Sequence, residues 1–125
     1  MAPDLSRNVE ALRASCDAGD LDTCVEVALR DGFQSSGWWT LLQRACDGNV
    51  ARGCRILAVY NQADQAEGRR RQGAAAAKHG CELNDTRSYH STHFYAVAAN
   101  DWEEAKRVQR RACELGDASA CKDRW

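Results

Sequence analysis

Residues 112–121 read Ala-Cys-Glu-Leu-Gly-Asp-Ala-Ser-Ala-Cys, so Cys113 and Cys121 stand eight residues apart. Between them, Gly116 favours the left-handed backbone that ends many helices. Asp117 follows, and aspartate is a preferred residue for capping the N-terminus of a new helix. The stretch therefore predicts a helix end, a tight reversal and a helix start, with one cysteine on each side of the reversal.

The same unit recurs along the chain, with first cysteines 30 to 35 residues apart. In chain order the eight-spaced positions are Cys16/Cys24, Cys46/Cys54, Cys81/Tyr89 and Cys113/Cys121. Three residues after each first position stand Gly19, Asn49, Asn84 and Gly116, which tolerate a left-handed backbone. Just before each first position stand the small residues Ser15, Ala45, Gly80 and Ala112. A period of this length built on a helical reversal predicts a repeat protein.

The predicted fold is all-α: an α/α solenoid of about four stacked helical hairpins in a single domain, 1–125. Helices are expected at about 5–18, 21–31, 37–47, 50–62, 64–79, 86–99, 101–115 and 118–124. The corresponding units span about 4–32, 36–62, 64–99 and 101–125. No alternating strand pattern of useful length interrupts them.

The second helices of three units align on Cys24, Cys54 and Tyr89. Five residues after these positions stand Leu29, Val59 and Phe94, four residues after them stand Ala28, Ala58 and His93, and three residues after them stand Val27, Leu57 and Thr92. Because the apolar residues recur at helical spacing, we expect them to face a neighbouring helix. His93 departs most from this register, which indicates a local opening between helices or a surface that faces a partner.

Composition and charge narrow the function classes. The chain has 125 residues and a net charge of −1, which argues against a nucleic-acid binder driven by bulk charge. No apolar run, the alanine stretch 74–77 included, is long enough to span a membrane. No leader is visible at residues 1–4. Seven cysteines favour an oxidising compartment, periplasmic or secreted, if the pairs are bridged; a cytoplasmic protein with reduced thiols is the alternative.

The units at 112–121, 45–54 and 16–24 resemble the cysteine-rich, Hcp-type branch of the bacterial Sel-one-like repeat family, which is related to tetratricopeptide repeats. The shared pattern is Ala-Cys-x-x-Gly-Asp-x-x-x-Cys with a helix on either side. The resemblance implies an α/α solenoid, disulfides between the eight-spaced cysteines, and function by protein–protein contact. The chain departs from the family at Ala28 and Ala58, where glycine is usual, and its repeats are shorter.

The residues alone leave bridged and reduced cysteines open, and we favour bridging. The bridges would be Cys16–Cys24, Cys46–Cys54 and Cys113–Cys121, with Cys81 left as a free thiol. Each would close a short loop and contribute roughly 2–3 kcal/mol. For Cys81, a core thiol packed on Tyr89 is favoured over a reactive group.

Two other function classes remain as alternatives. Cys81, His90 and His93 form a candidate metal- or cofactor-binding set, because His90 and His93 share a helix face and all three are zinc-type ligands. Cys81 with a histidine base is also a candidate nucleophile. By family analogy that activity would be a weak β-lactam or cell-wall hydrolysis, but no motif supports it. No catalytic residue is assigned, and no cofactor is expected.

Trp38 and Trp39, together with His93 and Tyr95, are the candidate partner-binding residues, with core packing as the alternative. Of the two adjacent tryptophans, one is expected in the core and the other partly exposed, and Trp102 is expected to pack near the start of its helix. Two arginine-rich runs, Arg69, Arg70 and Arg71 and then Arg107, Arg110 and Arg111, are interpreted as solvated faces, with an acidic protein partner as the alternative.

The sequence therefore predicts a non-enzymatic protein–protein interaction module, acting as an adaptor, an inhibitor or an immunity-type binder. It is expected to be a monomer or weak oligomer that binds a protein partner, without nucleic-acid binding or membrane insertion.

Overall fold

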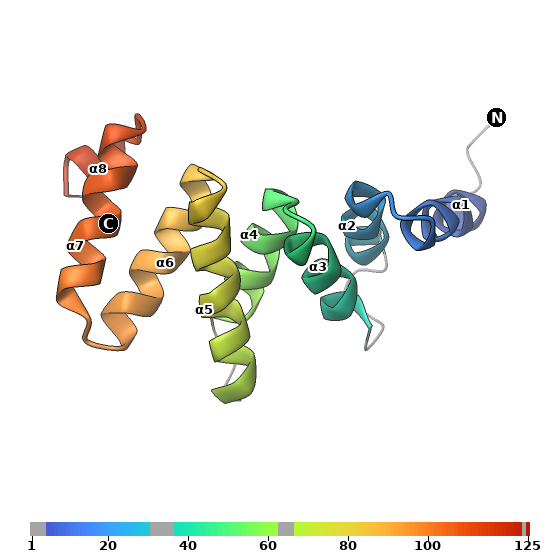
Figure 1. Ribbon diagram of the computed structural model, residues 1–125, viewed down its shortest axis with the longest axis horizontal. Helices are drawn as coiled ribbons and strands as arrows, with labels where there is room; N and C mark the ends of the chain where they lie inside the picture. Colours follow the sequence, from blue (N-terminus) through green and yellow to red (C-terminus); the bar gives the residue numbers. More distant parts are fainter. Residues whose placement is uncertain (1–4, 31–36, 63–66, 124) are drawn as a thin grey trace. The chain divides into compact units, whose positions relative to one another are not determined.

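The computed structural model describes residues 5–30, 37–62, 67–123 and 125, and all regular structure within these ranges is helical (Figure 1). The helices are α1 (Leu5–Asp17), α2 (Leu21–Arg30), α3 (Trp38–Asp47), α4 (Ala51–Tyr60), α5 (Glu67–Glu82), α6 (Thr86–Ala98), α7 (Trp102–Glu114) and α8 (Ala118–Cys121). The predicted all-α class is confirmed. None of the described helices is long and apolar enough to cross a membrane.

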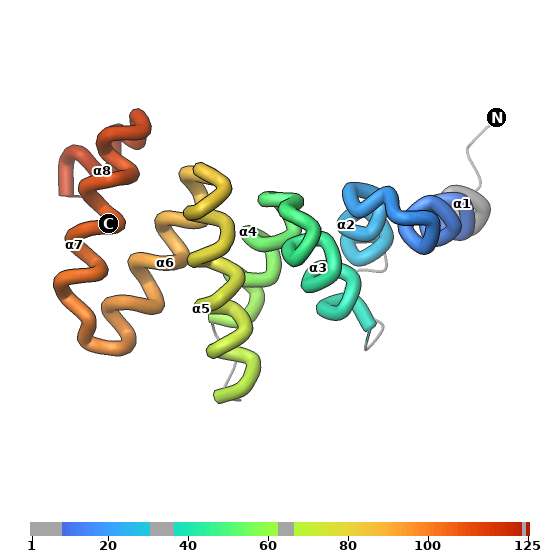
Figure 2. The backbone as a smooth tube through the Cα atoms, viewed as in Figure 1, coloured from blue at the N-terminus to red at the C-terminus, as the bar shows by residue number. Residues whose placement is uncertain are grey.

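The chain forms two compact units, Met1–Gly53 and Cys54–Trp125. In the first unit α1 packs on α2 and α2 on α3; in the second, α5 packs on α6, α6 on α7 and α7 on α8. The tube in Figure 2 follows these consecutive helices within each unit. Packing between sequence neighbours is typical of repeat proteins.

The four predicted reversals share one backbone geometry. Gly19, Asn49, Asn84 and Gly116 have positive φ angles of 103°, 69°, 60° and 102°. The N–H of the next residue donates to the carbonyl of the small residue before the first cysteine, at 2.9–3.0 Å: Asp20 to Ser15, Val50 to Ala45, Asp85 to Gly80 and Asp117 to Ala112. These bonds satisfy carbonyls at the helix ends. The predicted left-handed positions are confirmed.

A fifth reversal of the same geometry joins α6 to α7 without any cysteine. Asn100 has a φ of 58°, and the N–H of Asp101 donates to the carbonyl of Ala96 at 2.8 Å. The Asp101 side chain also accepts a hydrogen bond from the N–H of Glu104 and so caps α7. The turn therefore depends on the small, left-handed and capping residues rather than on a disulfide.

Two predicted helix ends lie three residues from the observed ones, and α4 ends two residues before the predicted residue 62. Helix α5 was expected to end at residue 79 but continues to Glu82, because Gly80 lies inside the helix and Asn84 is the left-handed residue that ends it. Helix α8 was expected to reach residue 124 but ends at Cys121, and Asp123 has a positive φ of 54° that a continuing helix does not allow.

Gly80 is small because α6 packs closely against it. A Cβ at this position would collide with the Oγ of Ser88 and lie 2.6 Å from its Cβ. We expect Gly80→Ala to lower the free energy of unfolding by about 1–3 kcal/mol through overpacking. Gly68, in the same helix, has open space around it, so Gly68→Ala should instead raise stability by about 0.4–1 kcal/mol. Chemical denaturation of both variants measures the difference, and equal effects would contradict close packing at Gly80.

The disulfides lie across the reversals. Cys16–Cys24 and Cys113–Cys121 each have a Cα–Cα distance of 4.8 Å. Cys46 and Cys54 are also disulfide-bonded, and Cys81 is a free thiol. The prediction of disulfides inside the helical hairpins is confirmed.

Candidate functional site

A groove of about 620 Å³ lies between α6 and α7 in the second unit. Its lining comes from α6 (His90, His93, Phe94 and Val97), from α7 (Trp102, Ala105, Lys106 and Gln109) and from Trp125. Three large aromatic side chains, Phe94, Trp102 and Trp125, give the groove an apolar character.

Trp125 is held against the face of α6. Its ring centroid lies 4.2 Å from that of His90 and 5.1 Å from that of His93, and its indole Nε1 donates to the Oγ of Ser119 at 3.0 Å. His90 and His93 therefore share one face of α6, as their spacing predicted. Together with Trp125, the two histidine rings form an aromatic wall of the groove.

His90 is held by a contact with Asp117, whereas His93 lies in an environment that disfavours its charged form. The Nε2 of His90 lies 2.7 Å from an oxygen of Asp117, which also caps α8. The hydrogen bond from Ser119, followed by that from His90, holds the pKa of Asp117 below its usual range. Burial, and then the neighbouring charge of His90, lower the pKa of His93. At neutral pH, His93 is therefore a neutral ring in the wall of the groove.

Several apolar side chains that were expected to be packed are exposed. Trp102 was expected to be packed, but 57% of its surface is exposed. Leu29, Val59 and Phe94 were expected to face a neighbouring helix, yet they are 38%, 49% and 42% exposed. The preceding residues of these helices, Val27, Ala28, Leu57 and Ala58, were also expected to face a neighbouring helix, and their full burial confirms that part of the prediction. The neighbouring helices cover only those positions, so the next residue on each helix faces outward.

The proposed metal ligands Cys81, His90 and His93 are not gathered into one site. The Sγ of Cys81 lies 3.1 Å from the Oγ1 of Thr92, and His90 pairs with Asp117. In the described ranges these three do not form a group with converging ligand atoms. Cys81 packs instead against the buried cluster of Tyr89, Val108, Ala112 and Ala120.

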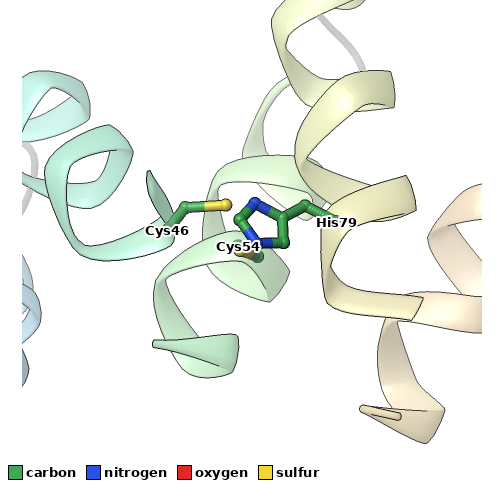
Figure 3. A group of neighbouring side chains, drawn as sticks. All are labelled: Cys46, Cys54 and His79. Carbon is green, nitrogen blue, oxygen red and sulfur yellow. The ribbon is translucent and has the colours of Figure 1, made fainter. Parts of the chain in front are cut away.

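Another group with metal-type ligands, Cys46, Cys54 and His79, is shown in Figure 3, with ligand atoms within 4.8 Å of one another. Both cysteines are disulfide-bonded, and metal ligation requires thiolates. With the disulfide formed, the group offers no sulfur ligand.

Cys81 is predicted to be unreactive. Burial raises the pKa of its thiol to about 11, against the opposing hydrogen bond with Thr92. Because alkylation requires the thiolate, labelling by iodoacetamide at about pH 8 should be about a hundredfold slower than for a peptide thiol of pKa about 8.5. The unfolded protein serves as the control. A native rate within tenfold of the unfolded rate would contradict the burial of Cys81.

The other candidate contact residues lie elsewhere. Trp38 and Trp39 begin α3 in the first unit; their ring centroids are 6.0 Å apart and both are half-buried, so neither is the core residue that was expected. The Tyr95 hydroxyl donates to the carbonyl of Ala58 at 2.7 Å, and burial raises its pKa to about 12. Tyr95 thus joins α6 to α4, while His93 lines the groove.

Three of the six arginines in the two basic runs form ion pairs within their own helix. Arg71 pairs with Glu67, Arg107 with Glu104, and Arg111 with Glu114, at 2.6–3.1 Å. These pairs are exposed and lie within one helix, so each contributes little to stability. They fit the interpretation of solvated faces.

No protein-family model matches the chain, and a search of curated proteins finds no match. Among solved structures, the chain is similar to cysteine-rich protein B of Helicobacter pylori, with 21% identity and a TM-score of 0.70. The superposition covers 96% of this chain and 94% of that protein. The chain therefore has the fold of that protein, a helical repeat solenoid, and the predicted resemblance to Sel-one-like repeats is confirmed at the level of the fold.

Proposed function

We propose that this chain is a non-enzymatic protein-binding scaffold and that the groove between α6 and α7 is part of its binding surface. The observation that supports this most directly is the exposure of Trp102 at the rim of an aromatic groove. Large exposed aromatic side chains beside a hollow are typical of protein interfaces. An adaptor, an inhibitor or an immunity-type protein would each use such a surface.

The disulfides support an oxidising compartment, periplasmic or secreted, as the place where this binding occurs. Trapping of thiols in cells of the source organism before lysis tests this part of the proposal. One free thiol per chain is expected, and seven would indicate a cytoplasmic protein.

The alternatives of metal binding and hydrolysis are not favoured by any observation on the described residues. A metal set that includes Cys81 lacks converging ligands. A nucleophile requires a reactive thiolate, and burial of Cys81 opposes its formation.

Photo-crosslinking in the source organism tests the proposed function. A photoreactive phenylalanine analogue in place of Phe94 is expected to form a covalent adduct with another protein. The same analogue in place of Arg71, which is exposed on α5 and does not line the groove, is the matched control. The adduct at Phe94 should disappear in a Trp102→Ala background. Equal adducts from both positions, or none from Phe94, would contradict a binding surface at the groove.

A further inference from the structure

A second hollow of about 530 Å³ lies on the other side of α6, between α6 and α4. Val59 and Tyr60 line it from α4, and Arg87 lines it from α6. Gln62 donates from its Nε2 to the Oγ of Ser91 at 3.3 Å and so connects the two sides. The groove between α6 and α7 is the first hollow. His90 and Phe94 line both hollows, so the two meet on α6 and form one continuous surface.

This surface collects the apolar side chains that the fold leaves exposed. In the described ranges five large hydrophobic side chains are exposed, and four of them line the two hollows: Val59, Tyr60, Phe94 and Trp102. The fifth, Leu29, occupies the same repeat position as Val59 and Phe94. Single exposed apolar residues need no explanation, but several gathered on one hollowed surface indicate a binding site.

The charged side chains on the same surface have one sign. Arg55, Arg87 and Lys106 line the hollows, and no Asp or Glu side chain does so among the described residues. Arg55 lies 3.5 Å from Asp85, whereas Arg87 and Lys106 pair with no described carboxylate. The chain as a whole has a net charge of −1, so this cationic character is local.

We propose that these two hollows bind an acidic peptide segment of a partner protein that also carries large apolar side chains. The inference rests on the proposed function and adds the chemistry of the occupant. Apolar side chains of the segment would pack on Phe94 and Trp102, while its carboxylates would pair with Arg87 and Lys106. A basic segment would place like charges opposite these cations, which is unfavourable.

Two other occupants have related chemistry. Single-stranded nucleic acid combines negative charge with stacking on aromatic rings, but the negative net charge of the chain disfavours it. A second copy of the chain would also cover the exposed apolar side chains. Both are included as outcomes of the test.

The test selects peptides from a displayed library of random dodecapeptides on the folded, disulfide-bonded protein. We expect the selected peptides to be rich in Asp and Glu and to contain large apolar residues. Combined Phe94→Ala and Trp102→Ala should weaken their binding about thirtyfold or more. Combined Arg87→Glu and Lys106→Glu should weaken it about tenfold, and added salt should weaken binding to the unaltered protein.

A matched control reverses the same number of charges outside the hollows, with Lys78→Glu and Lys122→Glu. Both side chains are exposed and line neither hollow, so this variant should bind the peptides as the unaltered protein does. Circular dichroism confirms that each variant is folded before its binding is measured.

The outcomes separate the inference from the proposed function. Selected peptides that need Phe94 and Trp102 but are neutral or basic would overturn the acidic occupant and leave the protein-binding function in place. Selected peptides that do not depend on Phe94 and Trp102 would overturn both. A labelled mixed-sequence oligonucleotide that displaces the peptides, or a dimer that is lost on Phe94→Ala with Trp102→Ala, would assign the surface to nucleic acid or to a second copy.

Discussion

Reduction of the disulfides is expected to remove most of the stability of this protein. Each disulfide closes a loop between cysteines eight residues apart, which is worth roughly 2–3 kcal/mol. The loss of three approaches the whole net stability of a small domain, about 5–15 kcal/mol. Denaturation followed by circular dichroism, on the oxidised protein and on the reduced and alkylated protein, measures the loss. Intact mass should rise by six hydrogens on reduction.

The disulfides are not expected to react at the same rate. Cys16 and Cys24 are buried, whereas Cys121 is exposed and Cys113 is half-buried. Limited reductant followed by alkylation should therefore label the Cys113–Cys121 pair first, and equal rates in the native protein would contradict this order. A Cys81→Ser variant that shows the same loss of stability on reduction would exclude the free thiol as its cause.

The helical hairpins could be predicted because the reversals are encoded locally. A small residue and a left-handed glycine or asparagine recur within six residues of each unit, and an aspartate follows in three of the four units. The cysteines mark the position of each reversal in the sequence. The same residue types stand at Ala96, Asn100 and Asp101, and they form the same turn. Because this reversal carries no cysteine, the cysteine spacing predicts only a helix boundary there and not the repeated turn.

The groove could not be predicted because it depends on which face of each helix its neighbour covers. Helical spacing identifies Val59 and Phe94 as apolar positions, but it does not distinguish a covered position from the exposed one beside it. The placement of Trp125 on His90 and His93 is a tertiary contact between distant parts of the sequence. The same spacing suggested a metal set with Cys81, whose thiol contacts Thr92 instead.

Tyr89→Ala is expected to lower the free energy of unfolding by about 3–5 kcal/mol, the range for truncating a large buried aromatic side chain. Tyr89 stands where the other units have their second cysteine and is almost fully buried. Its ring packs on Val108, Ala112 and Ala120, so it ties α6 to α7 and α8. The midpoint of chemical denaturation, followed by circular dichroism, measures the loss.

Tyr89→Phe is the matched control, because it keeps the ring and removes only the hydroxyl. The hydroxyl donates to the carbonyl of Cys81 at 3.3 Å, so its removal should cost about 0.5–1.5 kcal/mol. A loss as large as that of Tyr89→Ala would show that the hydrogen bond, rather than the ring, carries the stability.

Tyr89→Cys separates the two ways in which a unit can hold its reversal. Asn84 and the bond from Asp85 to Gly80 give this unit the turn of the bridged units, so the new cysteine is expected to form a disulfide with Cys81. Intact mass would then rise by eight hydrogens on reduction instead of six. The new disulfide should add roughly 2–3 kcal/mol to the free energy of unfolding, which is less than the loss of the Tyr89 ring removes. The variant should therefore remain less stable than the native protein. A variant as stable as the native protein would show that Tyr89 only replaces a lost disulfide and that its packing on α7 and α8 adds nothing further.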